Sequence, residues 1–301
     1  MADFETVAAV VQRLAVLLEA GIAPVSAWRH VAADGTSPVA TAVVARGGVG
    51  LDVAGQLLDA RDLAPMIERV AWSALAAAWW VAVESGAPLA PTLHRFAASL
   101  RDLAQSLRDV EVALAGPLAT SRIVLALPAV GLLFGALLGF DAPRILATTP
   151  AGWGCLVIGA LLIAGGVRWN RRLIRRARQI DATPGIALEL LAIAVSGGAS
   201  LDRSRVLVEL ALGEAGLSPL GQDADEVLAF SRAAGVPAAA LLQSEAQEVR
   251  RSTRTRAQLQ AAELGTRLLL PLGVCILPAF VALGVAPIVI AILSSTVGAF
   301  A

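Results

Sequence analysis

Three uncharged runs, each long enough to cross a lipid bilayer as a helix, constrain this chain more than any other feature. They cover residues 123–140, 151–167 and 268–297. A transmembrane helix needs about 20 mainly apolar residues to span about 30 Å of hydrocarbon. The composition agrees, because 16% of the residues are charged, compared with roughly a quarter in soluble domains. The sequence therefore predicts a membrane protein with three transmembrane helices, and we expect kinks in the third, which contains Pro271, Pro278 and Pro287.

A fourth apolar run, residues 70–83, has about 14 residues, a length that favours a buried core helix over a membrane span. Its aromatic residues Trp72, Trp79 and Trp80 are therefore expected in a hydrophobic core. The first residues lack the positively charged segment and the cleavage site of a secretory signal, so we expect the first segment to start inside the cell.

Basic residues are concentrated directly after the second predicted span. Six of the chain's 24 fall within eleven positions there. They are Arg168, Arg171, Arg172, Arg175, Arg176 and Arg178. The loop at residues 141–150 carries one acid and one base. Because basic residues accumulate on the cytoplasmic side of membrane proteins, we expect a multi-pass protein of the cytoplasmic (inner) membrane with its N-terminus in the cytoplasm and its C-terminus on the extracytoplasmic side.

Five of these arginines, from Arg168 to Arg176, follow the helical spacing i, i+3, i+4, i+7, i+8, which gathers side chains on one face. Leu173 and Ile174 lie off that face. We expect the arginines to contact anionic lipid headgroups, at about 1 kcal/mol per arginine near the surface. A second contact, with an acidic face of the neighbouring bundle, stays open. Nucleic acid is not an expected partner, because residues 179–265 carry 11 acids and 7 bases and would repel it.

Two polar regions remain, residues 1–116 and 170–265, and both are expected in the cytoplasm. Each contains the same pattern twice, in which a helical run ends at a glycine and a new helix begins after a short loop. The four glycines are Gly21, Gly86, Gly198 and Gly235. Glycine suits the left-handed position that closes a helix. Four copies of the pattern, two in each region, indicate an internal duplication of a helical bundle.

The predicted fold is therefore all-α, with two homologous cytoplasmic helical bundles and three transmembrane helices. No stretch shows the alternation that is typical of a β-strand. The predicted parts are a first bundle at 1–116, a transmembrane helix at 117–140, a short extracytoplasmic loop at 141–150, a transmembrane helix at 151–169, a basic juxtamembrane helix with the second bundle at 170–265, and a transmembrane helix at 266–297.

Small residues in the first span predict close helix packing. Gly131, Gly135 and Gly139 stand at four-residue spacing, which lets helix backbones approach each other in a membrane. This pattern supports association within one chain or between chains, in a homo-oligomer or with a paralogous subunit.

Each polar region continues through a long polar helix into a span, at HRFAASLRDLAQSLRDVEVALAGPLATSRIVLALP and at LLQSEAQEVRRSTRTRAQLQAAELGTRLLLPLGVCILP. This arrangement resembles the type II secretion system protein F family, and in particular its TadB and TadC branch from Flp (tight adherence) pilus machines. The closing run RLLLPLGVCILPAFVALGVAPIVIAIL is similar to the terminal span of that branch, and LLEAG, VESG and AVSGGASL resemble its helix-hairpin signatures. A longer first region, around GTSPVATAVVARGGVGLD, departs from the family pattern.

The resemblance implies a scaffold without enzymatic activity. Members of the family form the inner-membrane platform of type II secretion systems and type IV pili. They contact a hexameric secretion ATPase through their cytoplasmic domains and pass its work to pilin or pseudopilin subunits in the bilayer. The partners that the resemblance implies are these proteins and a further platform subunit, in addition to membrane lipid.

The residue types agree with a scaffold. A phosphate-binding P-loop needs a lysine, and the chain has none, so we do not expect the motor itself. Cys155 and Cys275 lie far apart in apolar runs, and neither Cys nor His stands at metal-ligand spacing. No catalytic residue, cofactor or metal is therefore expected. His30 and His94 each follow a hairpin, and both a repeated site and two ordinary surface side chains stay open.

Carboxylates at two hairpins are candidates for partner contact. Glu19 and Glu84 each end a helix just before a hairpin glycine, against the negative end of the helix dipole, at a cost on the order of half a kcal/mol. Contact with a basic patch on a partner and a solvated helix end both explain this placement. Together with Asp202 and the hairpin glycines, these carboxylates are the candidate partner-contact residues.

Two other function classes stay open. A transporter or channel component is the main alternative, but transporters place ionisable groups within their spans, and these spans have none. It would therefore have to form its path as an oligomer. A membrane-anchored signalling module would need an outward sensor or a catalytic domain, and the outward loop has only about ten residues.

Overall fold

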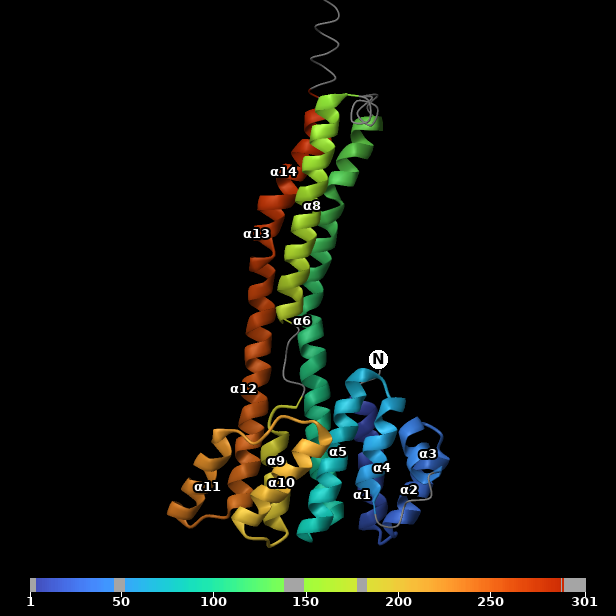
Figure 1. Cartoon of the computed structure of the whole chain (residues 1–301), viewed down its shortest axis with the longest axis vertical. Helices are drawn as coiled ribbons and strands as arrows, with labels where there is room; N and C mark the ends of the chain where they lie inside the picture. The colour runs from blue at the N-terminus through green and yellow to red at the C-terminus, as the bar shows by residue number, and fades with distance from the viewer. Residues whose placement is uncertain (1–3, 46–51, 138–148, 178–182, 288, 290–301) are drawn as a thin grey trace, which may run out of the picture. The chain divides into compact units, whose positions relative to one another are not determined.

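The computed structural model of the chain describes residues 4–45, 52–137, 149–177, 183–287 and 289. Every secondary-structure element in these residues is helical, which confirms the all-α prediction for the part of the chain described (Figure 1). The chain divides into two compact units. Unit 1 contains residues 1–108 and 181–255, and unit 2 contains residues 109–180 and 256–301.

Unit 1 takes its helices from both predicted polar regions. The first part supplies α1 (Phe4–Glu19), α2 (Pro24–Ala33), α3 (Pro38–Ala45), α4 (Val53–Ala60), the 3₁₀ turn η1 (Arg61–Leu63), α5 (Met66–Ser85) and the start of α6 (Leu89–Leu137). The second part supplies α9 (Ile186–Ser196), α10 (Leu201–Ala215), α11 (Gln222–Ala234) and the start of α12 (Ala238–Arg267). One hydrophobic core contains side chains from both parts. The longer first region contains α3, α4 and η1, which lie between α2 and α5 in the chain.

Helix α5 lies at the centre of this core. It packs against α1, α4, α9 and α10, and most of its side chains are buried. The run at residues 70–83 is therefore a core helix, as its length predicts. Trp72 and Trp79 are 1% and 5% exposed, whereas Trp80 is only partly buried. The ring of Trp28 on α2 lies 5.9 Å from that of Trp79, centroid to centroid, so aromatic packing joins α2 to α5.

Unit 2 contains the rest of α6, α8 (Pro150–Ala177) and the end of α12, which leads into four short helical elements. They are α13 (Leu269–Pro271), the π turn η2 (Leu272–Ile276), α14 (Leu277–Phe280) and the π turn η3 (Val281–Val285). Proline lacks a backbone donor, and its ring clashes with the preceding turn. Each π turn closes directly before a proline: Leu277 N–H donates to Leu272 O before Pro278, and Ala286 N–H donates to Val281 O before Pro287.

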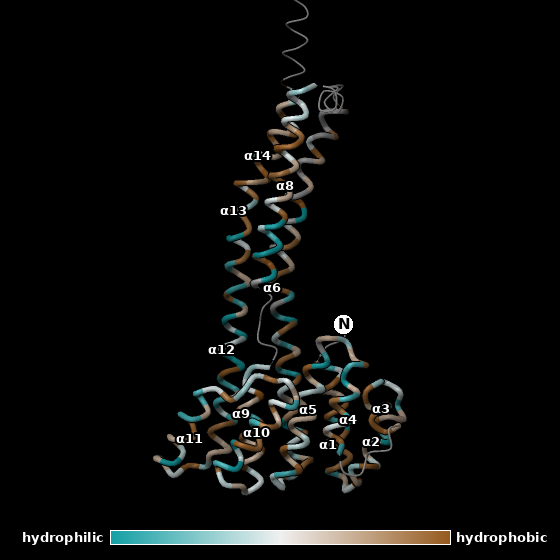
Figure 2. The backbone as a smooth tube through the Cα atoms, viewed as in Figure 1, coloured by the Kyte–Doolittle hydropathy of each residue, from teal (hydrophilic) through white to brown (hydrophobic). Residues whose placement is uncertain are grey.

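Large apolar side chains cover the outside of unit 2. They come from all three long segments and include Ile123, Val130, Leu133, Trp153, Leu156, Ile158, Leu161, Leu270, Val274, Leu277 and Val281. Figure 2 shows the same hydrophobic character along α13, α14 and the first part of α8. Soluble proteins rarely expose apolar surface on this scale, so the arrangement is typical of helices that face lipid or further helices.

Two helices in the described part of the chain are long and apolar enough to cross a membrane, Gly152–Arg175 and Ala238–Val285. The first covers residues 152–167 of the second predicted span, and the second covers residues 268–285 of the third. The first predicted span lies in α6 as far as Leu137, and its transmembrane character stays a prediction. Residues 138–148, with the end of that span and most of the predicted outer loop, lie outside the described residues.

Candidate functional site

The four glycine turns of unit 1 gather at one end of it, called the hairpin end from here on, at the lower edge of unit 1 in Figure 1. Gly21, Gly86, Gly198 and Gly235 have φ angles of 83°, 74°, 88° and 68°. This is the left-handed conformation that the sequence predicts for them. Glycine reaches it without the steric cost of a Cβ atom, so each turn reverses the chain directly after α1, α5, α9 or α11.

Two contacts between helix ends connect the turns at Gly86, Gly198 and Gly235. A Cβ atom added to Gly197, at the end of α9, would overlap the carbonyl oxygen of Ser85, at the end of α5. The two backbones therefore meet without a side chain between them. Arg232 in the last turn of α11 pairs with Asp202 in the first turn of α10, with 3.6 Å between Nη2 and Oδ1.

A ladder of polar contacts fixes α1 against α6. Arg108 Nη1 donates to Glu5 Oε2 over 2.5 Å, and Arg101 Nη1 donates to Gln12 Oε1 over 3.3 Å. At the hairpin end, His94 Nε2 lies 2.8 Å from Glu19 Oε2. The positions advance by seven residues on α1 and retreat by seven on α6. Since seven residues make about two helical turns, the ladder marks one continuous face of an antiparallel helix pair.

The candidate partner-contact carboxylates differ in their surroundings. The carboxylate of Glu19 is bound to His94, although 69% of its side chain stays exposed. The side chain of Asp202 is 96% exposed and pairs with Arg232 over 3.6 Å. Glu84 is exposed and forms no ion pair with any described residue. The hairpin end therefore presents three accessible carboxylates, of which Glu84 is the one without an ion-pair contact to a described residue.

A buried charged network lies deeper in unit 1. Glu189 on α9 accepts a hydrogen bond from Ser99 Oγ on α6 over 2.8 Å and one from Arg250 Nη1 on α12 over 3.1 Å. The side chains of Arg250 and Glu189 are only 11% and 9% exposed. Burial raises the pKa of Glu189, while Arg250, Ser99 and the nearby Arg95 act in the opposite direction.

Sequence reasoning missed this network, although a local signal for it exists. Glu189 is the only charged residue between positions 186 and 201, and a lone charge in a buried helix needs a partner. The identity of the partners depends on tertiary packing, because Ser99 and Arg250 lie 90 and 61 positions away in the chain.

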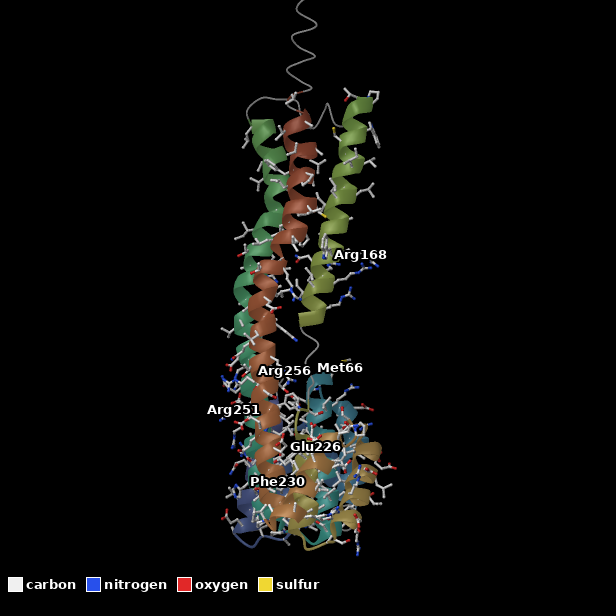
Figure 3. All side chains as sticks on the ribbon, turned by 90° about the vertical axis from the view of Figure 1, so that its left-hand side faces the viewer. Met66, Arg168, Glu226, Phe230, Arg251 and Arg256 are labelled. Carbon is white, nitrogen blue, oxygen red and sulfur yellow. The ribbon has the colours of Figure 1, made fainter. Side chains whose placement is uncertain are left out.

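The basic face after the second predicted span is part of α8. Arg168, Arg171, Arg172 and Arg175 are exposed, and Arg168 points outward from the ribbon in Figure 3. None of the four forms an ion pair with a described residue. The side chain of Arg176 and the whole of Arg178 lie outside the described part of the chain.

The opposite face of α8 is apolar and packs within unit 2. Leu173 and Ile174 lie against a small core formed by Leu114, Leu264 and Leu268 together with two alanines. The arginines therefore stay on the outer side of the helix, free to meet anionic groups.

Glycines bring the helices of unit 2 together. A Cβ atom on Gly131 of α6 would lie 2.6 Å from the ring of Phe280, and one on Gly159 of α8 would overlap Leu283. On α8, Gly166 faces Ile276 in the same way, with 3.0 Å to its Cδ1. Gly131 thus serves packing within the chain. The surroundings of Gly135 and all of Gly139 fall outside what is described.

The described residues contain no cluster of His, Cys, Asp or Glu that is suited to a metal ion, and both cysteines are free. His30 and His94 are not joined by a contact: His30 is exposed on α2, whereas His94 belongs to the ladder. A surface groove of about 430 Å³ lies between α4, α5 and α10, with Asp52, Trp80 and Glu214 among its lining residues. The geometry offers docking surfaces and a basic face.

No curated protein and no solved structure matches the chain. One family model does match, over residues 10–136, a stretch that runs from α1 to one residue before the end of α6. The model is that of type II secretion system (T2SS) protein F, and the match supports the type II secretion system protein F family for this chain.

Proposed function

We propose that the chain is a non-enzymatic inner-membrane platform of a type II secretion or type IV (Flp, Tad) pilus machine, which couples a cytoplasmic secretion ATPase to the assembly of pilin subunits. The observation that carries this proposal is the match of residues 10–136 to the protein F family model. The all-helical unit 1 and the apolar exterior of unit 2 support it.

Internal duplication of the helical bundle is part of the proposal. Gly198 lies 177 positions after Gly21, and Gly235 lies 149 positions after Gly86. In each half, the first glycine ends the helix that opens the half, and the second precedes the long helix that leaves unit 1. The insertion of α3 and α4 in the first half explains why the two offsets differ.

The same offsets relate two pairs of side chains. Glu189 lies 177 positions after Gln12, and Arg250 lies 149 positions after Arg101. Arg101 donates to Gln12 over 3.3 Å, and Arg250 donates to Glu189 over 3.1 Å. A contact that recurs between equivalent positions supports two copies of one ancestral bundle, which have come to share a single core.

The proposed topology has three spans, with the N-terminus and unit 1 in the cytoplasm and the C-terminus outside. The exposed arginines of α8 support this orientation, because a basic segment directly after a span is retained on the cytoplasmic side. Anionic headgroups of the inner leaflet are the proposed partner of that face.

The hairpin end is the proposed site of contact with the ATPase. It carries Glu19, Glu84 and Asp202 in accessible positions, and it lies opposite the end at which α6 and α12 leave unit 1. A basic patch on the partner would complement these carboxylates.

Deletion of the gene tests the function directly. The expected result is loss of surface filaments or of secreted protein, and restoration by the full chain supplied in trans. Retained filaments and secretion in the deletion strain would contradict the platform role.

The transporter alternative needs a separate measurement. We expect the full chain, purified in detergent, to retain a hexameric secretion ATPase, and we expect proteoliposomes that contain the chain to show no substrate flux above protein-free liposomes. Flux without ATPase capture would favour the transporter.

A further inference from the structure

Helices α6 and α12 run through both units, because each begins in unit 1 and ends in unit 2. A displacement of unit 1 can therefore reach the apolar segments through the continuous helical backbone of either one. The relative axial position of these two helices inside unit 1 therefore decides whether they move as one body or slide independently.

One side chain joins both helices inside unit 1. The two carboxylate oxygens of Glu189 accept hydrogen bonds from different helices: Oε1 from Ser99 on α6 and Oε2 from Arg250 on α12. Ser99 precedes the unit boundary on α6 by nine positions, and Arg250 precedes the boundary on α12 by five. The network thus lies close to the point at which both helices leave the unit.

The chemistry of the network suits it to fix the axial positions of α6 and α12 more than to stabilise the fold. A buried ion pair contributes little net stability, because desolvation of both charges offsets their attraction. Replacing such a pair with well-packed apolar side chains is often neutral or stabilising for the fold. The directional hydrogen bonds, by contrast, tolerate little axial sliding, since a shift of either helix by one residue, about 1.5 Å, would stretch the bond that this helix donates to Glu189. Breaking them would leave a charge in a site that is only 9% exposed.

The equivalent position of the first half lacks this property. Gln12 is neutral and partly exposed, and its contact with Arg101 is exposed to solvent. A change in that contact is compensated by water, whereas a change at Glu189 is not. Of the two equivalent contacts, the buried and charged one is therefore that of Glu189, the residue that contacts both helices leaving unit 1.

We propose that Glu189 fixes the axial register of α6 against α12, so that both helices move as one body when unit 1 moves. The inferred register rests on the contacts of Glu189 with Ser99 and Arg250, whereas its use in assembly rests on the proposed platform role. Glu189 acts as a positioning residue, through Ser99 and Arg250.

Distance measurements on the full chain test the register. Spin labels are placed through Ala98→Cys on α6 and Arg251→Cys on α12, both at exposed positions (Arg251 is labelled in Figure 3), in a chain that also carries Cys155→Ala and Cys275→Ala. Pulsed electron paramagnetic resonance then gives the distance distribution between the labels.

The decisive variant combines Glu189→Met with Arg250→Met, which removes the charges while it keeps the apolar volume. We expect a melting temperature that is unchanged or higher, together with a distance distribution that broadens or splits. The matched control combines Gln12→Met with Arg101→Met at the equivalent positions, and should leave the distribution narrow. Ser99→Ala, which keeps the ion pair, should broaden it to a smaller extent and covers the case in which the double variant does not fold.

Assembly provides the second readout. In cells, filament assembly or secretion should fall at least tenfold with the Glu189 and Arg250 double variant at normal protein levels. An unchanged distance distribution in that variant overturns the register, and unchanged assembly despite a broadened distribution overturns the coupling. If deletion of the gene itself leaves assembly intact, the platform role fails, and the distance measurement still decides the register.

Discussion

Gly197 at the end of α9 packs directly against the carbonyl oxygen of Ser85 at the end of α5, with no room for a Cβ atom between them. This contact joins the last turns of two helices that belong to different halves of the chain. The adjacent Gly198 has a different reason to be glycine, because its φ angle is 88° and nothing lies within 4 Å of an added Cβ. Two neighbouring positions thus require glycine for different physical reasons: Gly197 because of crowding, and Gly198 because of its backbone conformation.

Asparagine substitutions separate these two limits. Gly198→Asn should cost less than about 1 kcal/mol, because asparagine tolerates the left-handed conformation. Gly197→Asn should cost about 1–3 kcal/mol or more, because the backbones must separate to admit the side chain. Thermal unfolding of the purified full chain measures both. Equal costs at the two positions would contradict the close approach to Ser85.

The acidic hairpin end makes a second prediction. Glu19→Gln should change the free energy of unfolding by less than about 1 kcal/mol, because exposed ion pairs contribute little, yet it should weaken retention of the ATPase by the full chain. Glu5→Gln is the matched control: Glu5 is also an exposed α1 carboxylate in the ladder, with Arg108 as its partner, but at the opposite end. If both variants reduce ATPase retention equally, the effect does not come from the hairpin end.

Stability should depend on pH through Glu189. Its pKa lies above the ordinary value of 4.5, chiefly because of burial, so the folded state binds its proton more tightly than the unfolded state does. The stabilisation from protonated Glu189 is fully present below about pH 4.5 and is lost as the pH rises through the folded-state pKa.

The variant Glu189→Gln does not titrate at this position. The melting temperature of the wild type relative to that of Glu189→Gln should therefore fall as the pH rises above about 4.5. Thermal unfolding of both proteins across the acidic to neutral range gives this difference. A difference that is constant or grows with pH would show that burial does not raise the pKa of Glu189.

Packing within unit 2 predicts a coupled pair. Gly131→Ala places a Cβ atom against the ring of Phe280 and should cost about 1–3 kcal/mol. In a Phe280→Leu background the cost should fall, with a coupling energy of about 0.5–3 kcal/mol in the double-mutant cycle. Gly116→Ala on the same helix, where nothing lies within 4 Å, is the control and should be neutral or slightly stabilising. Additive effects of Gly131→Ala and Phe280→Leu would show that the two residues do not pack together.

The arginines of α8 should control orientation. Arg171→Glu combined with Arg175→Glu reverses two exposed charges directly after the second predicted span, and should retain part of the population with its C-terminus inside. Alkaline phosphatase and fluorescent-protein fusions to the C-terminus report the two orientations. Arg29→Glu combined with Arg203→Glu, both exposed in unit 1, should leave orientation unchanged. The same shift in both double variants would argue against a local effect of the α8 face.

The features that sequence predicted are local ones. Helix type follows from apolar spacing within a few turns, so the core helix at residues 70–83 and the long helices that lead into apolar segments were accessible from the sequence. The left-handed glycines were accessible for the same reason, because a helix ends within one or two residues of its cap. The opposite faces of α8, with arginines outside and Leu173 inside, also follow from helical periodicity.

What the tertiary structure decided are the pairings between distant helices. Glu5 meets Arg108 across 103 positions, and Glu189 meets Arg250 across 61. Each pairing requires two helices from distant parts of the sequence to pack with matching axial positions and rotations, which no single stretch encodes. For that reason the sequence by itself determined which segments are helices and where they turn, whereas only the packed structure determined that both halves share one core and that one buried carboxylate lies between the two helices that leave it.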